Sequence, residues 1–306
     1  MTLRAWILGW SCGLLWLTAA TQSHGQEPAA AAAQADPAAL AAQVLDEKKP
    51  AEEREAVIAK HPELSSALIS AMAAGMPAGT PEEYRRIPWI WRAAFAAGKR
   101  NDEAELRRIL EVSLPAPGAP LDDWRAVVVG GGLINGLTLA GVWPAERLGA
   151  VVAGNDALIA RWRRALDLAS AMADDEKVKT GTRYDALRML GAEPWDRRGA
   201  QLMRYLTKGV DAELQQGAVS ALSDVKGPAP VVAQALLSGF DHYSPNNREF
   251  ALDALLRDEA RALALLDAVK GGRVDRGLLG TKRTEALKAH PVEPVRALAT
   301  SVLGAP

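Results

Sequence analysis

The segment Ala186-Leu187-Arg188-Met189-Leu190 has the form Ala-x-x-apolar-Leu, and this form recurs at 218–222 and 251–255. The spacings between these copies are 32 and 33 residues. A fourth copy at 299–303 follows after 48 residues, and the excess length can hold an extra turn around 271–280. A period of this size is typical of proteins built from stacked structural repeats. Chance matches in an alanine-rich chain are the alternative explanation.

A second amphipathic helix is expected between successive copies. Apolar residues recur there at intervals of three and four residues, which is the spacing of one helix face. The ranges with this pattern are 197–208, 228–240 and 258–270. A helix pair cannot bury its apolar stripe alone, but stacked pairs form one continuous core. We therefore predict an all-α fold, and within it an α-solenoid of stacked antiparallel helix pairs.

The rest of the chain is also predicted to be helical. Alanine and leucine dominate its apolar residues, whereas only three Phe and four Tyr occur, and this composition favours helices over strands. Helical spacing continues through 38–175, with breaks at Pro and Gly. We expect one repeat domain over 38–306, with a less regular half at 38–175 and regular repeats at 176–306.

The N-terminus has the layout of a secretory signal peptide, predicted over 1–25. One positive charge at Arg4 is followed by an apolar stretch over 5–20 and then by small and polar residues. Cleavage after Ala20 is the alternative, and a flexible Ala/Pro linker is expected at 26–37. The apolar stretch is short for a membrane span, so a retained anchor is the less favoured interpretation. The predicted product is exported, periplasmic or secreted, with no stable membrane span after cleavage.

The composition of the mature chain excludes several classes of function. Cleavage removes Arg4 and the single cysteine, Cys12, from a chain with 36 basic and 37 acidic side chains. Without cysteine, a thiol nucleophile, a disulfide framework, a Cys-ligated zinc or iron–sulfur site and covalent haem attachment are excluded. The near-neutral charge provides no large basic field, so nucleic acid is not an expected partner.

The glycine-rich stretch 127–136 does not fit a nucleotide-binding loop. A dinucleotide fingerprint requires Gly-x-Gly-x-x-Gly, but Asn135 stands three residues after Gly132, and no Gly-Lys-Ser or Gly-Lys-Thr follows. We interpret the stretch as a helix whose glycines admit a close neighbour. The alternative is a break between two short helices, with Asn135 capping the second.

No other motif in the sequence carries recognisable chemistry. His61, His242 and His290 lack the spacing of metal ligands on a helix. Adjacent carboxylates lie in charge runs, and the serines form no Gly-x-Ser-x-Gly elbow and no Ser-x-x-Lys pair. We therefore predict no enzyme activity, no metal and no cofactor.

Tryptophans supply the candidate interaction surface, because they are frequent anchors of protein interfaces. Trp89 and Trp91 cannot share one helix face, since residues two apart point about 200° apart. The candidate set consists of Trp89, Trp91, Trp124, Trp143 and the loop residue His242. Core packing is the alternative role of the tryptophans.

Several stretches of the second half resemble the HEAT-type repeat segment of a protein family. They are 181–191, 213–224, 247–256, 265–274 and 287–299, the last with Pro294-Val295-Arg296. The family comprises large exported planctomycete-type membrane-bound dehydrogenases with PVC-type haem-binding domains. The resemblance covers roughly residues 50 to 304.

Such proteins carry a propeller upstream and a PVC-type cytochrome c domain downstream. Neither a propeller nor the haem-attachment motif Cys-x-x-Cys-His occurs in these 306 residues. The resemblance therefore implies a HEAT-like scaffold and transfers no catalytic residue.

We expect an exported, non-catalytic scaffold for protein–protein interaction. Its expected partner is an envelope protein, with a cytochrome c or a dehydrogenase-like subunit as the candidate. One alternative is an enzyme or a protein that binds carbohydrate or another small ligand, with a site assembled around Trp89, Trp124, Trp143 and His242. Non-covalent haem or metal binding through the histidines is a weaker alternative.

Overall fold

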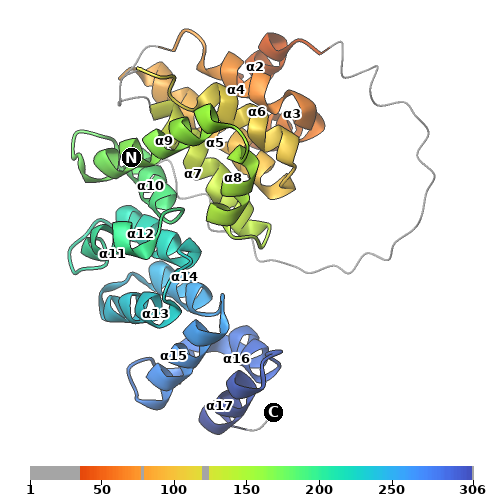
Figure 1. Cartoon of the computed structure of the whole chain (residues 1–306). Coiled ribbons are helices and arrows are strands. Elements are labelled where there is room, and N and C mark those ends of the chain that lie inside the picture. Colours follow the sequence, from red (N-terminus) through yellow and green to blue (C-terminus); the bar gives the residue numbers. More distant parts are fainter. Residues whose placement is uncertain (1–34, 77–78, 119–123, 305–306) are drawn as a thin grey trace. The chain divides into compact units, whose positions relative to one another are not determined.

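The structure is a computed structural model that describes residues 35–76, 79–118 and 124–304 (Figure 1). Sixteen α-helices and three short 3-10 helices account for the regular structure of these residues, and no strand occurs among them. The predicted all-α class is confirmed for this part of the chain. The predicted signal peptide and the linker up to residue 34 lie outside the described residues.

The first half contains eight α-helices among its described residues. They are α2 (Pro37–Leu45), α3 (Ala51–Lys60), α4 (Ser65–Ala73), α5 (Pro81–Arg100), α6 (Glu103–Ser113), α7 (Trp124–Leu139), α8 (Pro144–Val152) and α9 (Asp156–Asp174), with the 3-10 helix η1 (Pro62–Leu64) before α4. Helix α4 packs on α2, α5 and α6, and α5 packs most extensively on α7.

The second half continues from α9 through shorter helices. They are α10 (Thr180–Leu190), α11 (Trp195–Arg204), α12 (Ala212–Asp224), α13 (Ala229–Ser238), η2 (Phe240–His242), α14 (Pro245–Leu255), α15 (Glu259–Lys270), η3 (Arg276–Leu279), α16 (Gly280–Lys288) and α17 (Glu293–Leu303). Helix α10 packs on α12 and α12 on α14, while α13 packs on α15 and α15 on α17. Helices two apart in sequence therefore lie side by side (Figure 1).

The first three copies of the Ala-x-x-apolar-Leu segment occupy equivalent places, on α10, α12 and α14. The fourth copy lies on α17, whose principal neighbours are α15 and α16. It therefore does not continue the α10, α12 and α14 series, although Ala299 and Leu303 are buried as the equivalent residues of the first three copies are. The length before it holds a complete helix, α16, as well as η3, so the excess is more than the extra turn that the sequence predicts.

Local sequence explains where several helices begin. The Thr80 hydroxyl accepts a hydrogen bond from the Glu83 N–H, and Pro81 occupies the first turn of α5. The Asp102 carboxylate accepts a bond of 2.8 Å from the Glu105 N–H and caps α6. Between them, Asn101 ends α5 in the left-handed conformation, at φ 56°.

The glycine-rich stretch is one continuous helix, α7, which confirms the first of the two interpretations. Its glycines let α5 approach closely. A Cβ built on Gly136 would overlap the Phe95 carbonyl oxygen and lie 2.7 Å from the Gly98 Cα, and one on Gly132 would lie 2.9 Å from the Trp91 oxygen. Backbone packs against backbone here, so any larger residue forces the two helices apart.

Helix α7 is apolar because it is a core helix. Its side chains from Ala126 to Val129, together with Leu133, Ile134 and Leu137, are fully buried. Among the described residues, no single helix combines the length and hydropathy of a membrane span; only α7 and α8 taken together do, and they are bent by 119°.

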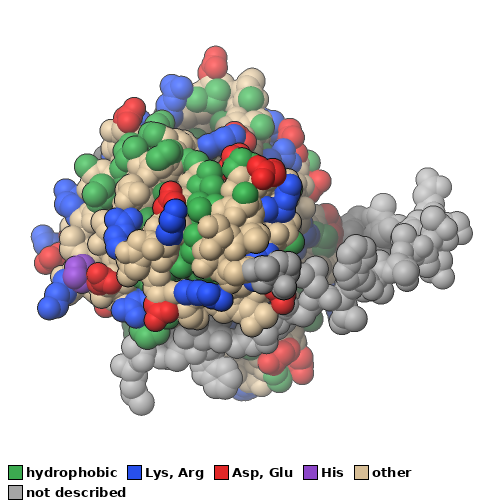
Figure 2. Space-filling view, turned by 90° about the horizontal axis from the view of Figure 1, so that it is seen from below, with side chains coloured by type: hydrophobic (Ala, Val, Ile, Leu, Met, Phe, Trp, Pro, Cys, Tyr) green, Lys and Arg blue, Asp and Glu red, His purple; other side chains and the backbone are tan. Residues whose placement is uncertain are grey.

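The face shown in Figure 2 carries mixed charge. Lys and Arg side chains alternate there with Asp and Glu, and apolar side chains lie between them. Many of the charges form surface ion pairs, such as Arg204 with Asp174 and Lys226 with Glu146. Exposed pairs of this kind contribute little to stability.

The contact between α5 and α7 can be tested with two glycine substitutions. We expect Gly136→Ala to lower the free energy of unfolding by about 1–3 kcal/mol, because the new methyl group meets backbone atoms that cannot rotate away. Gly149→Ala in α8 is the matched control, since a Cβ there has no atom within 4 Å. The control should be neutral or gain up to about 1 kcal/mol of helix propensity. Urea unfolding measures both, and equal effects of the two changes would contradict the packing described.

Candidate binding site at Trp143

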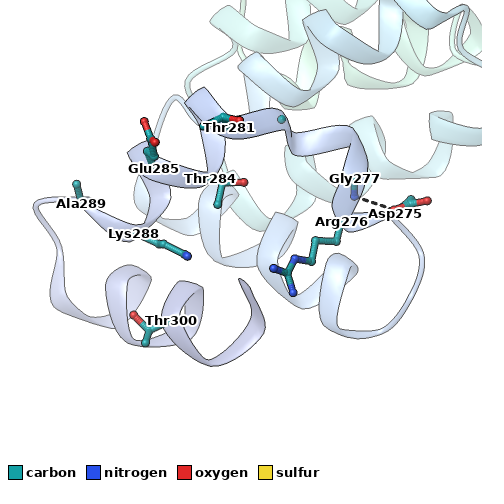
Figure 3. A pocket seen from close by; sticks show the side chains of 10 residues that line it. Asp275, Arg276, Gly277, Thr281, Thr284, Glu285, Lys288, Ala289 and Thr300 are labelled. Carbon is teal, nitrogen blue, oxygen red and sulfur yellow. Dashed lines mark hydrogen bonds between the residues drawn. The ribbon is translucent and has the colours of Figure 1, made fainter. Parts of the chain in front are cut away.

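Two concave regions lie on the surface of the described residues. A hollow of about 1000 Å³ lies between η3, α16 and α17 (Figure 3). A smaller groove of about 370 Å³ lies beside Trp143. The groove is lined by Trp143, Lys226, Gly227, Ala229, Asp258, Glu259, Ala260, Arg261 and Leu263. These residues come from the start of α8, from the loops that follow α12 and α14, and from the first turns of α13 and α15.

Trp143 is half-buried and precedes the first residue of α8. Three cations lie near its ring: the Arg257 Cζ is 4.5 Å from the ring centroid, the Arg261 Cζ is 5.7 Å and the Lys226 Nζ is 5.9 Å from it. Cations within about 6 Å of an indole ring are attracted to its negative face. The ring therefore lies among charged residues of the second half.

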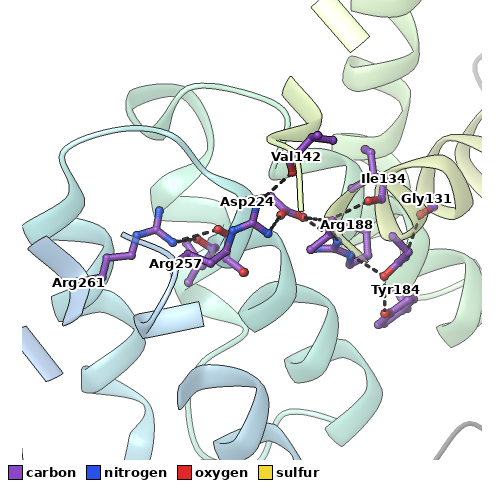
Figure 4. Close-up of polar contacts among 12 residues, drawn as sticks. Gly131, Ile134, Val142, Tyr184, Arg188, Asp224, Arg257 and Arg261 are labelled. Carbon is purple, nitrogen blue, oxygen red and sulfur yellow. Dashed lines mark hydrogen bonds and ion pairs between the residues drawn. The ribbon is translucent and has the colours of Figure 1, made fainter. Parts of the chain in front are cut away.

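A buried carboxylate, Asp224, lies at the centre of a polar network (Figure 4) that includes Arg257, the arginine near the Trp143 ring. Its Oδ2 accepts a bond of 2.7 Å from the Arg188 Nη2, and its Oδ1 accepts one of 2.8 Å from the Arg257 Nη1. The Thr138 hydroxyl lies 2.8 Å from the Asp224 Oδ2. Asp224 is 0% exposed, so both of its oxygens are satisfied by protein groups rather than solvent.

Arg188 carries this network into α7. Its Nε donates to the Asn135 Oδ1 at 3.1 Å, and its Nη2 also lies 3.1 Å from the Thr138 Oγ1. The Asn135 amide in turn donates to the Gly131 carbonyl oxygen at 2.8 Å. Asn135 thus lies inside the helix and orients a buried arginine, rather than capping a helix start. The Arg188 Nη1 is buried without a hydrogen-bond partner among the described residues.

Arg257 and Arg261 connect the network to the backbone around Trp143. The Arg257 Nη2 donates to the Val142 carbonyl oxygen at 3.0 Å, which fastens the turn between α7 and α8. The Arg261 guanidinium donates to the Leu222, Ser223 and Val225 carbonyl oxygens at the end of α12. Burial lowers the pKa of Arg261, and the nearby Asp258 carboxylate acts in the opposite direction. Hydrogen bonds to backbone therefore hold both arginines that lie near the Trp143 ring.

The other predicted surface residues lie elsewhere. Trp89 is 6% exposed, with the Arg54 Cζ 3.8 Å and the Arg92 Cζ 4.7 Å from its ring centroid, so it is a core residue. The Trp91 Nε1–H donates to the Asp185 Oδ1 at 3.0 Å, and its ring stacks on Phe95.

Trp124 and His242 do not join these contacts. Trp124 is half-buried at the start of α7, and His242 is exposed in η2. Of the predicted residues, Trp143 is the one that the structure connects to the Asp224 network. The structure does not gather the predicted set into one surface.

The described residues contain no group of three or more His, Asp or Glu side chains placed to hold a metal ion. The Trp143 groove offers an aromatic ring, short apolar side chains and charged residues of both signs. Such a lining suits contact with a peptide segment or a small ligand. The sequence did not predict the Asp224 network. The one feature of the sequence that could have indicated this network is Arg188, a charged residue between the apolar residues of the repeated segment.

No family model, curated protein or solved structure matches this chain. The resemblance to the HEAT-type repeat segment therefore stays a prediction from the sequence.

The Asp224 network makes a prediction about stability. Asp224→Asn leaves the buried Arg188 and the largely buried Arg257 without a counter-charge, so we expect a loss of about 3–5 kcal/mol in unfolding free energy. Glu146→Gln is the control, because it breaks an ion pair with Lys226 in which both side chains are more than half exposed. The control should cost less than about 1 kcal/mol. Chemical denaturation measures both values, and a loss below 1 kcal/mol for Asp224→Asn would show that the pair is dispensable.

Proposed function

We propose that this protein is an α-solenoid of HEAT-like helix pairs that serves as a non-catalytic scaffold for protein–protein interaction. The observation that carries the proposal is the packing of helices two apart, α10 on α12 on α14 and α13 on α15 on α17. Each helix in such an array contacts its near neighbours in sequence, which is the arrangement of solenoid proteins. Solenoids most often act by presenting an extended binding surface.

The turn between α7 and α8 is the proposed contact point for the partner. Leu139 is 67% exposed, more than any other large hydrophobic side chain among the described residues, and Trp143 follows it in the same turn. Arg257 fixes this turn through the Val142 carbonyl oxygen. An exposed aliphatic and an aromatic side chain on a fixed backbone lose little conformational entropy on binding, which is typical of interface anchors.

The proposed partner is an exported envelope protein. The signal-like layout of residues 1–25 supports export to the periplasm or beyond the cell. The resemblance noted in the sequence favours a cytochrome c or a dehydrogenase-like subunit as the partner. In that assembly the partner would contain any redox chemistry, and this chain would hold or orient it.

The solenoid proposal predicts how a local defect spreads. Leu287→Ala empties a fully buried position in α16, so amide hydrogen exchange should accelerate in α15, α16 and α17 and stay nearly unchanged in α4–α7. Leu68→Ala in α4, which is also fully buried, should give the reverse pattern. Exchange measured by mass spectrometry distinguishes the two. Uniform acceleration over all described helices in both variants would contradict a repeat array.

The contact proposal predicts position-dependent crosslinking. A photoreactive amino acid at Leu139 should capture a defined envelope protein, whereas one at Met203 of α11, which is 41% exposed, should not. Trp143→Ala should reduce the yield from position 139 by about tenfold or more, the size of effect typical of an interface anchor. The far-ultraviolet circular dichroism of each variant controls for folding.

The contact proposal would be contradicted by crosslinks from both positions to the same set of proteins. It would also be contradicted if position 139 gave no crosslink. Recovery of a small ligand with the protein instead would favour the ligand-binding alternative.

A further inference from the structure

We propose that the junction between the helix pairs α9–α10 and α11–α12 is a hinge. The contact between α10 and α12 is its axis, and the interface between α9 and α11 opens as the salt concentration rises. Opening changes the angle between neighbouring pairs, and in a solenoid that angle determines the curvature of the binding surface. The inference rests on the repeat array of the proposed function, but it does not require the partner contact at Leu139 and Trp143.

Polar side chains, rather than close backbone packing, join α9 to α11. Helices α10 and α12 pack closely on one another, whereas the backbones of α9 and α11 make no comparable contact. The facing residues are three or four positions apart, which places them on one face of each helix. They are Asp167, Ser170 and Asp174 of α9 and Arg197, Gln201 and Arg204 of α11.

Two exposed ion-pair sites hold this interface closed. The Asp167 Oδ1 accepts hydrogen bonds from the Arg197 Nη2 at 2.5 Å and from the Arg198 Nη2 at 3.2 Å. The Asp174 Oδ2 accepts one from the Arg204 Nη2 at 2.6 Å. The side chains of both aspartates, of Arg197 and of Arg204 are between 43% and 63% exposed. Exposed pairs contribute little to stability and are screened by salt, so the closed form weakens as ionic strength rises.

Uncharged contacts define the closed form. The Ser170 hydroxyl donates to the Gln201 Oε1 at 2.8 Å, and the Tyr205 hydroxyl donates to the Ala173 carbonyl oxygen at 2.7 Å. Tyr205 is buried. Because these hydrogen bonds join groups without net charge, salt does not screen them. Salt therefore shifts the balance between closed and open forms without unfolding α11.

The opposite side of the junction is held more firmly. Arg188 of α10 and Asp224 of α12 form an ion pair in which the side chains are 1% and 0% exposed. Breaking a buried pair costs several times more than breaking an exposed pair, and salt screens a buried pair much less. The junction therefore bends by opening between α9 and α11, while α10 and α12 stay together.

The test measures distances between nitroxide labels by double electron–electron resonance. Cys12→Ser restricts labelling to introduced cysteines. One pair replaces Ala160 of α9 and Ala200 of α11, which are both exposed, and the control pair replaces Ser220 of α12 and Asn246 of α14. Between about 0.01 M and about 1 M sodium chloride, we expect the first distance to lengthen and broaden and the control distance to stay constant.

Paired substitutions test the two ion-pair sites. Asp167→Asn with Asp174→Asn should raise the ratio of open to closed forms at low salt by about fivefold, the effect of losing two exposed pairs. Glu249→Gln with Asp253→Asn also removes two exposed acids, but these pair with Arg283, so the ratio should not change.

The hinge would be overturned if the first distance responded neither to salt nor to the Asp167 and Asp174 substitutions. It would also be overturned if the control distance lengthened equally. Failure of the repeat array itself would appear elsewhere, in the exchange patterns of the Leu287→Ala and Leu68→Ala variants.

Discussion

The second half of the structure depends on how the charge of Asp224 is compensated. This carboxylate is fully buried, and burying a lone charge costs several kcal/mol even after the protein relaxes. Arg188 and Arg257 donate to its two oxygens from α10 and from the segment after α14. Residues of α10, of α12 and of the segment after α14 therefore meet at one ionic centre. An apolar core could slide by a helix turn at small cost, but this centre admits one alignment, because a shift would leave charges unpaired.

Helix α7 of the first half also contacts this ionic centre. Thr138 contacts Asp224, and Asn135 accepts from Arg188. Helix α7 is itself fixed against α5 by glycines that bring the two backbones into contact. Helix α7 is thus held in two ways. Polar contacts fix it to Asp224 and Arg188, and close backbone packing fixes another of its sides to α5. As a result, the alignment of α10, α12 and α14 also determines where the turn carrying Trp143 lies.

The sequence predicted the features that depend on local spacing. The helical class, the positions of the first three repeated segments and the helical glycine stretch all follow from residue periodicity, which is a property of short windows. The segment 299–303 matches the repeated form as a fourth copy, but its helix, α17, packs on α15 and α16 rather than on α14, because a buried Ala and Leu stripe suits more than one position in a helical stack. The Asp224 network escaped prediction for a different reason. Arg188 and Asp224 are 36 residues apart, and no local pattern states which charges will meet.

The tryptophans also show that residue spacing does not predict which side chains will be covered by distant parts of the chain. Helical geometry correctly separates Trp89 from Trp91 by about 200°, but it does not reveal that α5 is covered on both sides. Arg54 and Arg92 lie against the Trp89 ring. Trp91 donates a hydrogen bond to Asp185 of α10, and its ring stacks on Phe95. Trp143 differs because it precedes a helix instead of lying within one, so its ring can border a groove while cations of the next helix pairs hold its position. The three cations near its ring restrict the Trp143 side chain in the free protein. Binding there costs less entropy than binding to a mobile loop, and this favours Trp143 over the other tryptophans as the anchor for a partner.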